Sequence, residues 1–213
     1  MLRTADRALT LEDPGPGEPL MQMHVRRTTI PEVLVVEHEA FRDERGFFME
    51  AYRADHFSEH AALGLPNTFV QLNHSRSTRG VVRGLHFQWD PPMGKLMRVA
   101  RGEAFIVAVD IRPGSPTLGR YESIVANDEN HLQLWAPASF ARGFCALSEI
   151  VDIEYLTTGT YGPHAESGIA WNDPDVGIDW PINDPILSGK DATAQSLAAW
   201  LARPEAQHFH YER

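Results

Sequence analysis

A short basic region in the middle of the chain is suited to binding an anion. Residues 74–102 contain six arginine or lysine side chains and a single acidic one, Asp90. The whole chain has a formal net charge of −10, so a local positive patch favours an anion-binding site. A solvent-facing edge strand would give the same pattern, because edge strands commonly carry charge. The basic residues are Arg76, Arg79, Arg83, Lys95, Arg98 and Arg101.

His86 lies inside this region, in the strand-like sequence GVVRGLHFQ at residues 80–88. Its unperturbed pKa of about 6.5 makes it a candidate general base near neutral pH. Strict strand alternation places His86 with Gln88 on one face and Arg83 on the other. Both basic side chains reach one pocket only if the strand bulges, and Gly84 between them would permit this.

The ten histidines raise the alternative of a metal site. His56 and His60 are four residues apart on a predicted helix, but a solvent-facing polar stripe is the commoner reason for such spacing. Gln88 stands two residues after His86, where a metal-binding barrel strand would need a second histidine. We therefore expect no metal.

Lysine is rare in this chain, which has seventeen arginines but only Lys95 and Lys190. A lysine supplies a compact charge whose pKa shifts readily on burial, so these two positions are candidates for chemistry, although chance alone could leave two. Tyr155 shares a strand face with Val151 and Ile153, and we expect it to point into the core. A tyrosine there is often only hydrogen-bonded to the backbone.

Ser188 and Asp191, in the sequence SGKD, have the spacing of a capping box at a helix start. Capping is therefore one explanation for both residues. Nothing in the spacing along the chain brings Asp191 to His86.

The elements that hold these residues are predicted to be mostly strands. Short alternating apolar segments with turn signals between them, over residues 24–186, predict an all-β sandwich or barrel. A short helix is predicted from Asp55 to Gly64, and an amphipathic helix over residues 191–203, ending before Pro204. We expect residues 1–23 to be a flexible extension and 187–213 to be a helical segment packed on the barrel.

Composition limits the class of protein. With 43% apolar and 23% charged residues the chain is typical of a globular protein, and no apolar run of about 18 residues predicts a membrane span. The acidic net charge disfavours a nucleic-acid partner. The first twenty residues lack the apolar region of a secretory signal, and Cys145 is the lone cysteine, expected to be buried and unreactive, so we expect a cytoplasmic protein.

Ordered motifs over residues 24–202 resemble those of dTDP-4-dehydrorhamnose 3,5-epimerases. They include DERGFFMEAY, FVQLNHSRS, RGLHFQ, GKL, QLWAPASFARGF, YLTTGTYGP and LSGKDA. The resemblance implies an antiparallel jelly roll of the cupin type that works without a metal or organic cofactor. It also implies a homodimer in which the partner chain helps to complete each site.

The resemblance also implies roles for individual residues. His86 matches the base, Asp191 the carboxylate that orients it, Lys95 the lysine near the keto oxygen, and Tyr155 the acid. Arg45 and Arg83 match arginines that bind the nucleotide diphosphate. The full set of implied substrate-binding residues is Arg45, Glu50, Gln71, Asn73, Arg83, Arg142, Tyr161 and Lys190.

The implied reaction is epimerisation at C3 and C5 of dTDP-4-dehydro-6-deoxy-D-glucose, giving dTDP-4-dehydro-L-rhamnose. One departure bears on specificity, because Arg142 in FARGF stands where many members have histidine, and arginine cannot shuttle a proton near neutrality. A single-position 3- or 5-epimerase and a non-catalytic nucleotide-sugar-binding cupin are therefore kept as alternatives. A metal-dependent cupin oxygenase is disfavoured by Gln88.

Overall fold

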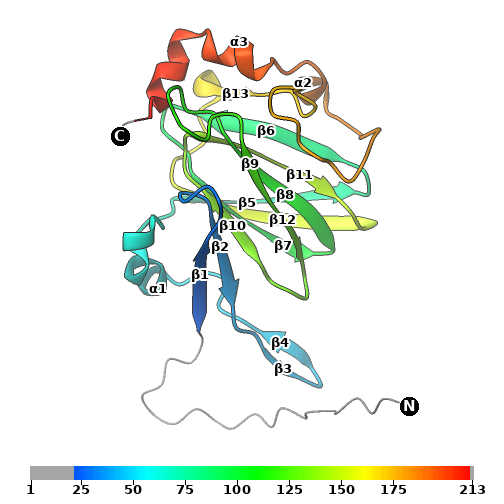
Figure 1. Cartoon of the computed structure of the whole chain (residues 1–213). Helices are drawn as coiled ribbons and strands as arrows, with labels where there is room; N and C mark the ends of the chain where they lie inside the picture. The colour runs from blue at the N-terminus through cyan, green and yellow to red at the C-terminus, as the bar shows by residue number, and fades with distance from the viewer. Residues whose placement is uncertain (1–21, 212–213) are drawn as a thin grey trace, which may run out of the picture.

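Two antiparallel sheets packed face to face form the body of the protein in the computed structural model, which describes residues 22–211 (Figure 1). In spatial order, the first sheet contains β1 (Met23–Arg27), β2 (Leu34–His38), β10 (Gln133–Ala136), β7 (Lys95–Arg101), β12 (Ile150–Thr157) and β5 (Gln71–Thr78). The second contains β13 (Glu166–Gly168), β6 (Val82–Gln88), β11 (Phe140–Ala146), β8 (Glu103–Asp110) and β9 (Tyr121–Asn127). The predicted all-β sandwich is confirmed.

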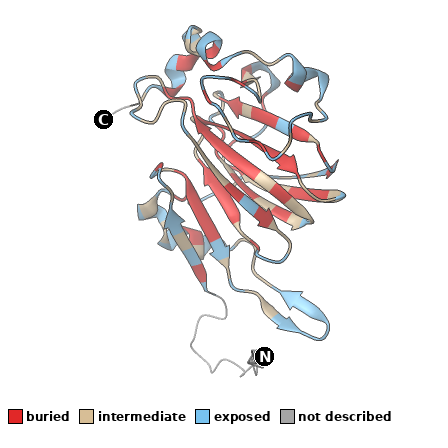
Figure 2. Cartoon of the chain, turned by 45° about the vertical axis from the view of Figure 1, so that its right-hand side comes forward, coloured by how far each residue is buried: buried red, intermediate tan, exposed pale blue. Residues whose placement is uncertain are grey.

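The second sheet is covered on both faces. Its inner face packs on the first sheet through side chains such as Ile106 and Phe144. Its outer face packs on the C-terminal segment, where Val107 and Val109 share a cluster with Trp200. A strand covered on both faces needs apolar residues at successive positions, which is why β8 reads FIVAV rather than alternating. Figure 2 shows this sheet as largely buried.

A bulge in β6 turns two basic side chains toward the inner face. Arg142 pairs with His86 and Phe144 with Arg83, so three steps along β6 oppose two along β11. Gly84 lies at this point with φ of +124°, and a Cβ there would be 2.6 Å from the Cα of Gly143. The predicted role of Gly84 in the bulge is confirmed.

The first helical segment begins earlier than predicted. Helix α1 (Ala54–Glu59) starts after Arg53 rather than at Asp55, and a 3₁₀ turn, η1 (Ala61–Leu63), follows it. Gly64 ends the segment with a left-handed φ of 105°, which confirms its predicted role as a C-terminal cap.

The prediction of a single C-terminal helix over residues 191–203 is wrong. The segment is divided into α2 (Gly189–Ala192), α3 (Leu197–Leu201) and the 3₁₀ helix η3 (Pro204–Phe209). The helix is interrupted because the Gln195 carbonyl accepts a hydrogen bond from Ala170 N at 2.8 Å, which pulls this stretch into strand-like pairing. Ser196 then caps α3 by accepting from Ala199 N.

A hairpin of β3 (Phe41–Asp43) and β4 (Gly46–Phe48) projects from the body and is largely exposed (Figures 1 and 2). Most of the extension predicted over residues 1–23 lies outside the described residues, and Met23 begins β1. Cys145 is buried, as predicted. No helix in residues 22–211 is long and apolar enough to cross a membrane.

Candidate active site

A pocket between the two sheets gathers basic and proton-carrying side chains from five strands. We call it the inter-sheet pocket, and its volume is about 150 Å³. It is lined by Ser75, Arg83, His86, Lys95, Met97, Arg142, Gly143, Phe144 and Tyr155.

His86 is held by a carboxylate from a distant part of the chain. Its Nε2 lies 2.5 Å from Oδ1 of Asp191, which is buried at the start of α2. The Ser188 hydroxyl donates to Asp191 Oδ2 at 2.8 Å, and Asp191 N donates to the same Ser188 oxygen at 3.1 Å. Asp191 therefore takes part in the predicted capping arrangement and also contacts His86.

The charge on Asp191 determines which nitrogen of His86 can accept a proton. Burial alone would raise the pKa of Asp191, but the hydrogen bonds from His86 and Ser188 outweigh it and hold this pKa below its ordinary value. An ionised carboxylate accepts hydrogen bonds only, so Nε2 of His86 carries a hydrogen, and in the neutral form of the ring Nδ1 is the nitrogen with the lone pair. Within residues 22–211, no group hydrogen-bonds to Nδ1.

Lys95 and Tyr155 belong to the opposite wall, on β7 and β12 of the first sheet. The Lys95 ammonium lies 5.1 Å from the centre of the Tyr155 ring. Burial is the main cause that lowers the pKa of Lys95 to about 7, and burial also raises the pKa of Tyr155. Tyr155 packs on the core beside Val151 and Ile153, as predicted, and its hydroxyl makes no hydrogen bond to the described residues.

The pocket therefore has a proton acceptor on one wall and proton donors on the other. The raised pKa of Tyr155 keeps its proton in place near neutral pH, and Nδ1 of His86 has no hydrogen-bond partner among the described residues. This arrangement can remove a proton from one face of a small molecule and return one to the opposite face.

Arg83 lines the pocket close to solvent. Its Nε donates to the Ser77 hydroxyl at 3.0 Å and its guanidinium donates to the Arg76 carbonyl at 3.1 Å. These two bonds hold the guanidinium in place while leaving its charge without a carboxylate partner among the described residues. Arg83 is thus suited to an anionic group at the pocket entrance.

Six of the eight predicted binding residues lie outside the pocket lining, and four of these six, Gln71, Asn73, Tyr161 and Lys190, are linked by side-chain contacts. The Gln71 side chain donates to Asn73 at 2.8 Å and accepts from Tyr161 N at 3.1 Å. Lys190 contacts Oε2 of Glu166 at 2.8 Å, and the Tyr161 hydroxyl donates to the same oxygen at 2.9 Å.

Sequence reasoning missed Glu166. It lines a second hollow together with His86, Lys190 and Asp191. Burial would raise the pKa of Glu166, but contacts with Lys190 and Tyr161 hold it below its ordinary value. The short sequence ESG around this carboxylate gives no local sign of the placement.

Arg45 and Glu50 are not brought to the pocket within this chain. Arg45 stands in the turn of the β3–β4 hairpin, paired with Asp43, and its side chain is 84% exposed. Glu50 follows the same hairpin and lies 3.7 Å from Arg53.

The basic region is divided between two roles. Arg83 and Lys95 line the pocket, as an anion site requires. Arg76, on the edge strand β5, instead pairs with Asp152 of β12, and Arg98, on the inner strand β7, pairs with Glu154. The edge-strand alternative is therefore correct for part of the region.

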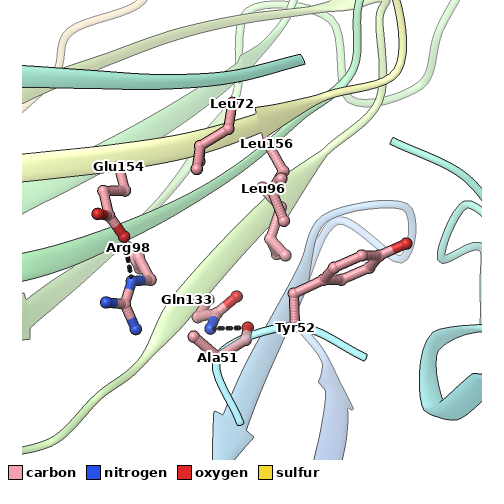
Figure 3. Close-up of a pocket in the computed structure, with 8 residues that line it drawn as sticks. All are labelled: Ala51, Tyr52, Leu72, Leu96, Arg98, Gln133, Glu154 and Leu156. Atoms are coloured by element: carbon pink, nitrogen blue, oxygen red, sulfur yellow. Dashed lines mark hydrogen bonds and ion pairs between the residues drawn. The ribbon is translucent and has the colours of Figure 1, made fainter. Parts of the chain in front are cut away.

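A different hollow lies on the outer face of the first sheet (Figure 3). Its floor consists of Leu72, Leu96 and Leu156. Its polar groups largely bond among themselves: Arg98 to Glu154 at 3.0 Å, and the Gln133 amide to the Ala51 carbonyl. An apolar floor with paired polar groups is suited to being covered rather than to proton transfer.

Residues 22–211 contain no cluster of three or more histidine, cysteine or acidic side chains placed to hold a metal ion. The contact between His56 and His60 also differs from that of a metal-ligand pair, because it joins a ring nitrogen to a backbone carbonyl. The His60 ring nitrogen Nδ1 lies 2.9 Å from the His56 backbone carbonyl.

Comparison with known proteins gives a consistent result. The profile of a family described as dTDP-4-dehydrorhamnose 3,5-epimerase matches residues 27–199. A protein with that name from Shigella flexneri is 48% identical over 176 residues, which are 82% of this chain and 96% of that protein. A dTDP-4-dehydrorhamnose 3-epimerase from Streptomyces niveus is 40% identical over 83% of this chain and 84% of that protein.

A solved structure is similar to this chain in both fold and sequence. It is a dTDP-6-deoxy-D-glucose-3,5-epimerase from Legionella pneumophila in complex with dTDP-4-keto-L-rhamnose. It matches with a TM-score of 0.83 and 42% identity, over 90% of this chain and 100% of that chain.

Proposed function

Because the chain belongs to the dTDP-4-dehydrorhamnose 3,5-epimerase family, we propose that its inter-sheet pocket is where this isomerase inverts C3 and C5 of dTDP-4-dehydro-6-deoxy-D-glucose. The product is dTDP-4-dehydro-L-rhamnose, and the fold is the family's cupin-type jelly roll. One observation carries the assignment of the site. His86, held by Asp191, faces Lys95 and Tyr155 across a single pocket.

The first step is proton removal beside the C4 ketone. Hydrogens on the carbons that flank a ketone are acidic because the electron pair left behind is shared with the carbonyl oxygen as an enolate. His86 Nδ1 takes this proton, and Asp191 stabilises the imidazolium that forms by accepting from Nε2. Asp191 also prevents the ring from rotating away from the substrate.

The second step needs charge stabilisation and a proton from the opposite face. Lys95 stabilises the negative charge on the C4 oxygen, and preorganised charges of this kind typically contribute most to such reactions. Tyr155 then gives its proton to the carbon from the wall opposite His86. The carbon regains a hydrogen on its other face, so its configuration is inverted with no net change in composition.

The size of the pocket determines which part of the substrate it encloses. A volume of about 150 Å³ is below the roughly 300–1,000 Å³ of pockets that enclose a whole drug-sized ligand. We therefore place only the sugar ring inside. The diphosphate lies at Arg83, and the remaining binding residues, Gln71, Asn73, Tyr161 and Lys190, serve the parts outside.

The reaction is tested by proton NMR of the wild-type protein with dTDP-4-dehydro-6-deoxyglucose in deuterated water. We expect solvent deuterium at both C3 and C5. Deuterium at one position only would assign a single-position epimerase, the activity in the name of the Streptomyces niveus relative. Binding without any deuterium incorporation would mean a non-catalytic sugar-nucleotide-binding protein.

A second copy of the chain is proposed to complete each site. The hairpin that carries Arg45 is exposed, with Phe48 at 68%, and the apolar hollow of Figure 3 is lined in part by Leu72, which is 60% exposed. Exposed apolar groups next to an edge strand are suited to burial against a partner chain. In such a homodimer, Arg45 would reach the diphosphate in the partner's pocket.

The homodimer leads to a prediction for Arg45→Ala. Loss of one charged hydrogen bond, about 1.5–3 kcal/mol, should raise KM by about 10- to 100-fold with little change in kcat. Sedimentation should show a dimer. Mixing Arg45→Ala with His86→Asn should raise activity at low substrate above the sum of the separate variants, because one site in each mixed dimer is intact. No such rise would contradict a shared site.

We also propose a cytoplasmic location for this enzyme. It is supported by the single cysteine, which is free and buried in the structure. Recovery of the protein with membranes or in the growth medium after fractionation would contradict this proposal.

A further inference from the structure

Arg142 is a buried cation without a carboxylate partner among the described residues. Its exposure is 2%. One terminal nitrogen of its guanidinium donates to the carbonyls of Pro137, at 3.1 Å, and Phe140, and the other donates to the Met93 carbonyl. A buried charge with only neutral partners is energetically unfavourable, which suggests that the charge has a function.

The third nitrogen of the guanidinium, Nε, indicates what this function is. Nε of Arg142 is buried and has no hydrogen-bond partner in residues 22–211. Arg142 lines the inter-sheet pocket and stands directly opposite His86 in the pairing of β11 with β6. The Ser75 hydroxyl, which lines the same pocket, is also buried without a partner. Buried polar atoms are almost always paired, so two unpaired atoms at one pocket indicate a polar ligand.

We propose that Arg142 is a catalytic residue that donates its Nε hydrogen to the C4 oxygen of the bound sugar and stays positively charged throughout the reaction. This proposal rests on the proposed function and adds a residue to it. As the proton moves to His86, the C–H electron pair forms the C=C bond and the carbonyl π pair moves to the C4 oxygen. Arg142 stabilises that oxygen without gaining or losing a proton, which a histidine in its place could do.

A fixed charge at Arg142 leaves Lys95 as the cation that titrates. Burial is the largest cause of the lowered pKa of Lys95, and Arg142 and Lys190 act in the same direction, while Glu166 opposes them. The Tyr155 ring, which carries no charge near neutrality, lies against the ammonium. If protonated Lys95 assists the C4 oxygen, activity falls as pH rises through about 7. Removing the charge of Arg142 should move this fall to higher pH.

A purely structural role predicts different results. The contacts with Pro137, Phe140 and Met93 connect the start of β11 to the chain before β7, and they use only the terminal nitrogens. A structural clamp would affect thermal stability but would leave kcat and KM close to those of wild type in the folded variant. The experiment therefore measures both quantities.

The test compares wild type with Arg142→Gln, using lysine labelled with ¹³C at Cε. The chain has only two lysines, so the spectrum has two signals, and Lys95→Met assigns them. We expect the Lys95 midpoint to move upward in Arg142→Gln. We also expect kcat to fall by about 10²–10³-fold, the usual effect of removing one oxyanion donor, with KM changed less than about 10-fold. The high-pH fall of kcat should shift in the same direction as the Lys95 midpoint.

An unchanged Lys95 midpoint together with kcat close to that of wild type would overturn the proposal. If Arg142→Gln does not fold, Arg142→Lys serves instead, since it keeps a cation but lacks the Nε donor. A fall in its kcat at constant KM supports the proposal, and an unchanged kcat overturns it. The NMR titration needs no substrate, so failure of wild type to exchange deuterium would reject the proposed function separately.

Discussion

Replacing His86 by asparagine is expected to lower kcat by about 10²–10⁴-fold and to stop deuterium incorporation at both carbons of the substrate. This is the usual contribution of a positioned general base. The asparagine amide does not accept a proton near neutrality, so the variant lacks a base at this position. The measurement is NMR in deuterated water, with KM from initial rates.

Tyr155→Phe is the matched control for this prediction. It removes the hydroxyl from the opposite wall and leaves His86 and Asp191 unchanged. Hydrogen exchange should then continue with retention of configuration, while inversion is lost. If His86→Asn still exchanges deuterium at the wild-type rate, another group is the base and the assignment is wrong.

Replacing Lys95 by methionine should change activity and stability in opposite directions. Loss of the ammonium beside the C4 oxygen should lower kcat by about 10²–10³-fold. Methionine, however, is apolar and of similar length, and it needs no burial of charge on β7. The folded protein should therefore become more stable, as expected where a functional group is held in an unfavourable environment.

The pH dependence of this stability change follows from the pKa of Lys95. It is about 7 in the folded protein against an ordinary 10.5. Below pH 7 both the folded and unfolded chains carry the proton, and the folded chain bears the full cost of a buried charge. Between pH 7 and 10.5 the unfolded chain binds more protons, so wild-type stability rises with pH. The advantage of the variant should be largest at or below pH 7 and should disappear near pH 10.5.

Thermal unfolding of both proteins across this pH range measures the difference. Each kcal/mol corresponds to about 2–4 °C in Tm for a domain of this size. Lys190→Met is the control, because Lys190 is exposed and paired with Glu166, so it should give no stabilisation near pH 7. A Tm of Lys95→Met that lies below wild type at pH 7 would contradict a charge held at an energetic cost.

Much of the fold could be predicted because it depends on residues that are close in sequence. Alternating apolar residues must face a core, which predicts the strands and the inward position of Tyr155. Gly84 could be assigned to a bulge, and Gly64 to a helix end, because few other residues adopt a positive φ. Resemblance in the motifs added the family and the identity of the candidate residues, which local physics alone did not supply.

The tertiary structure alone decided which of these residues meet. Asp191 is 105 positions from His86, and only the docking of α2 on β6 brings the two side chains within 2.5 Å. Strand pairing likewise decides the positions of Glu166, on β13 beside β6, and of Arg142, on β11 beside β6, where its Nε has no partner among the described residues. The break in the helix before α3 has the same origin, because the Gln195 carbonyl accepts a hydrogen bond from Ala170 N instead of one from within a helix. Propensity acts over a few neighbouring residues, whereas these contacts depend on how distant segments pack, which no local pattern encodes.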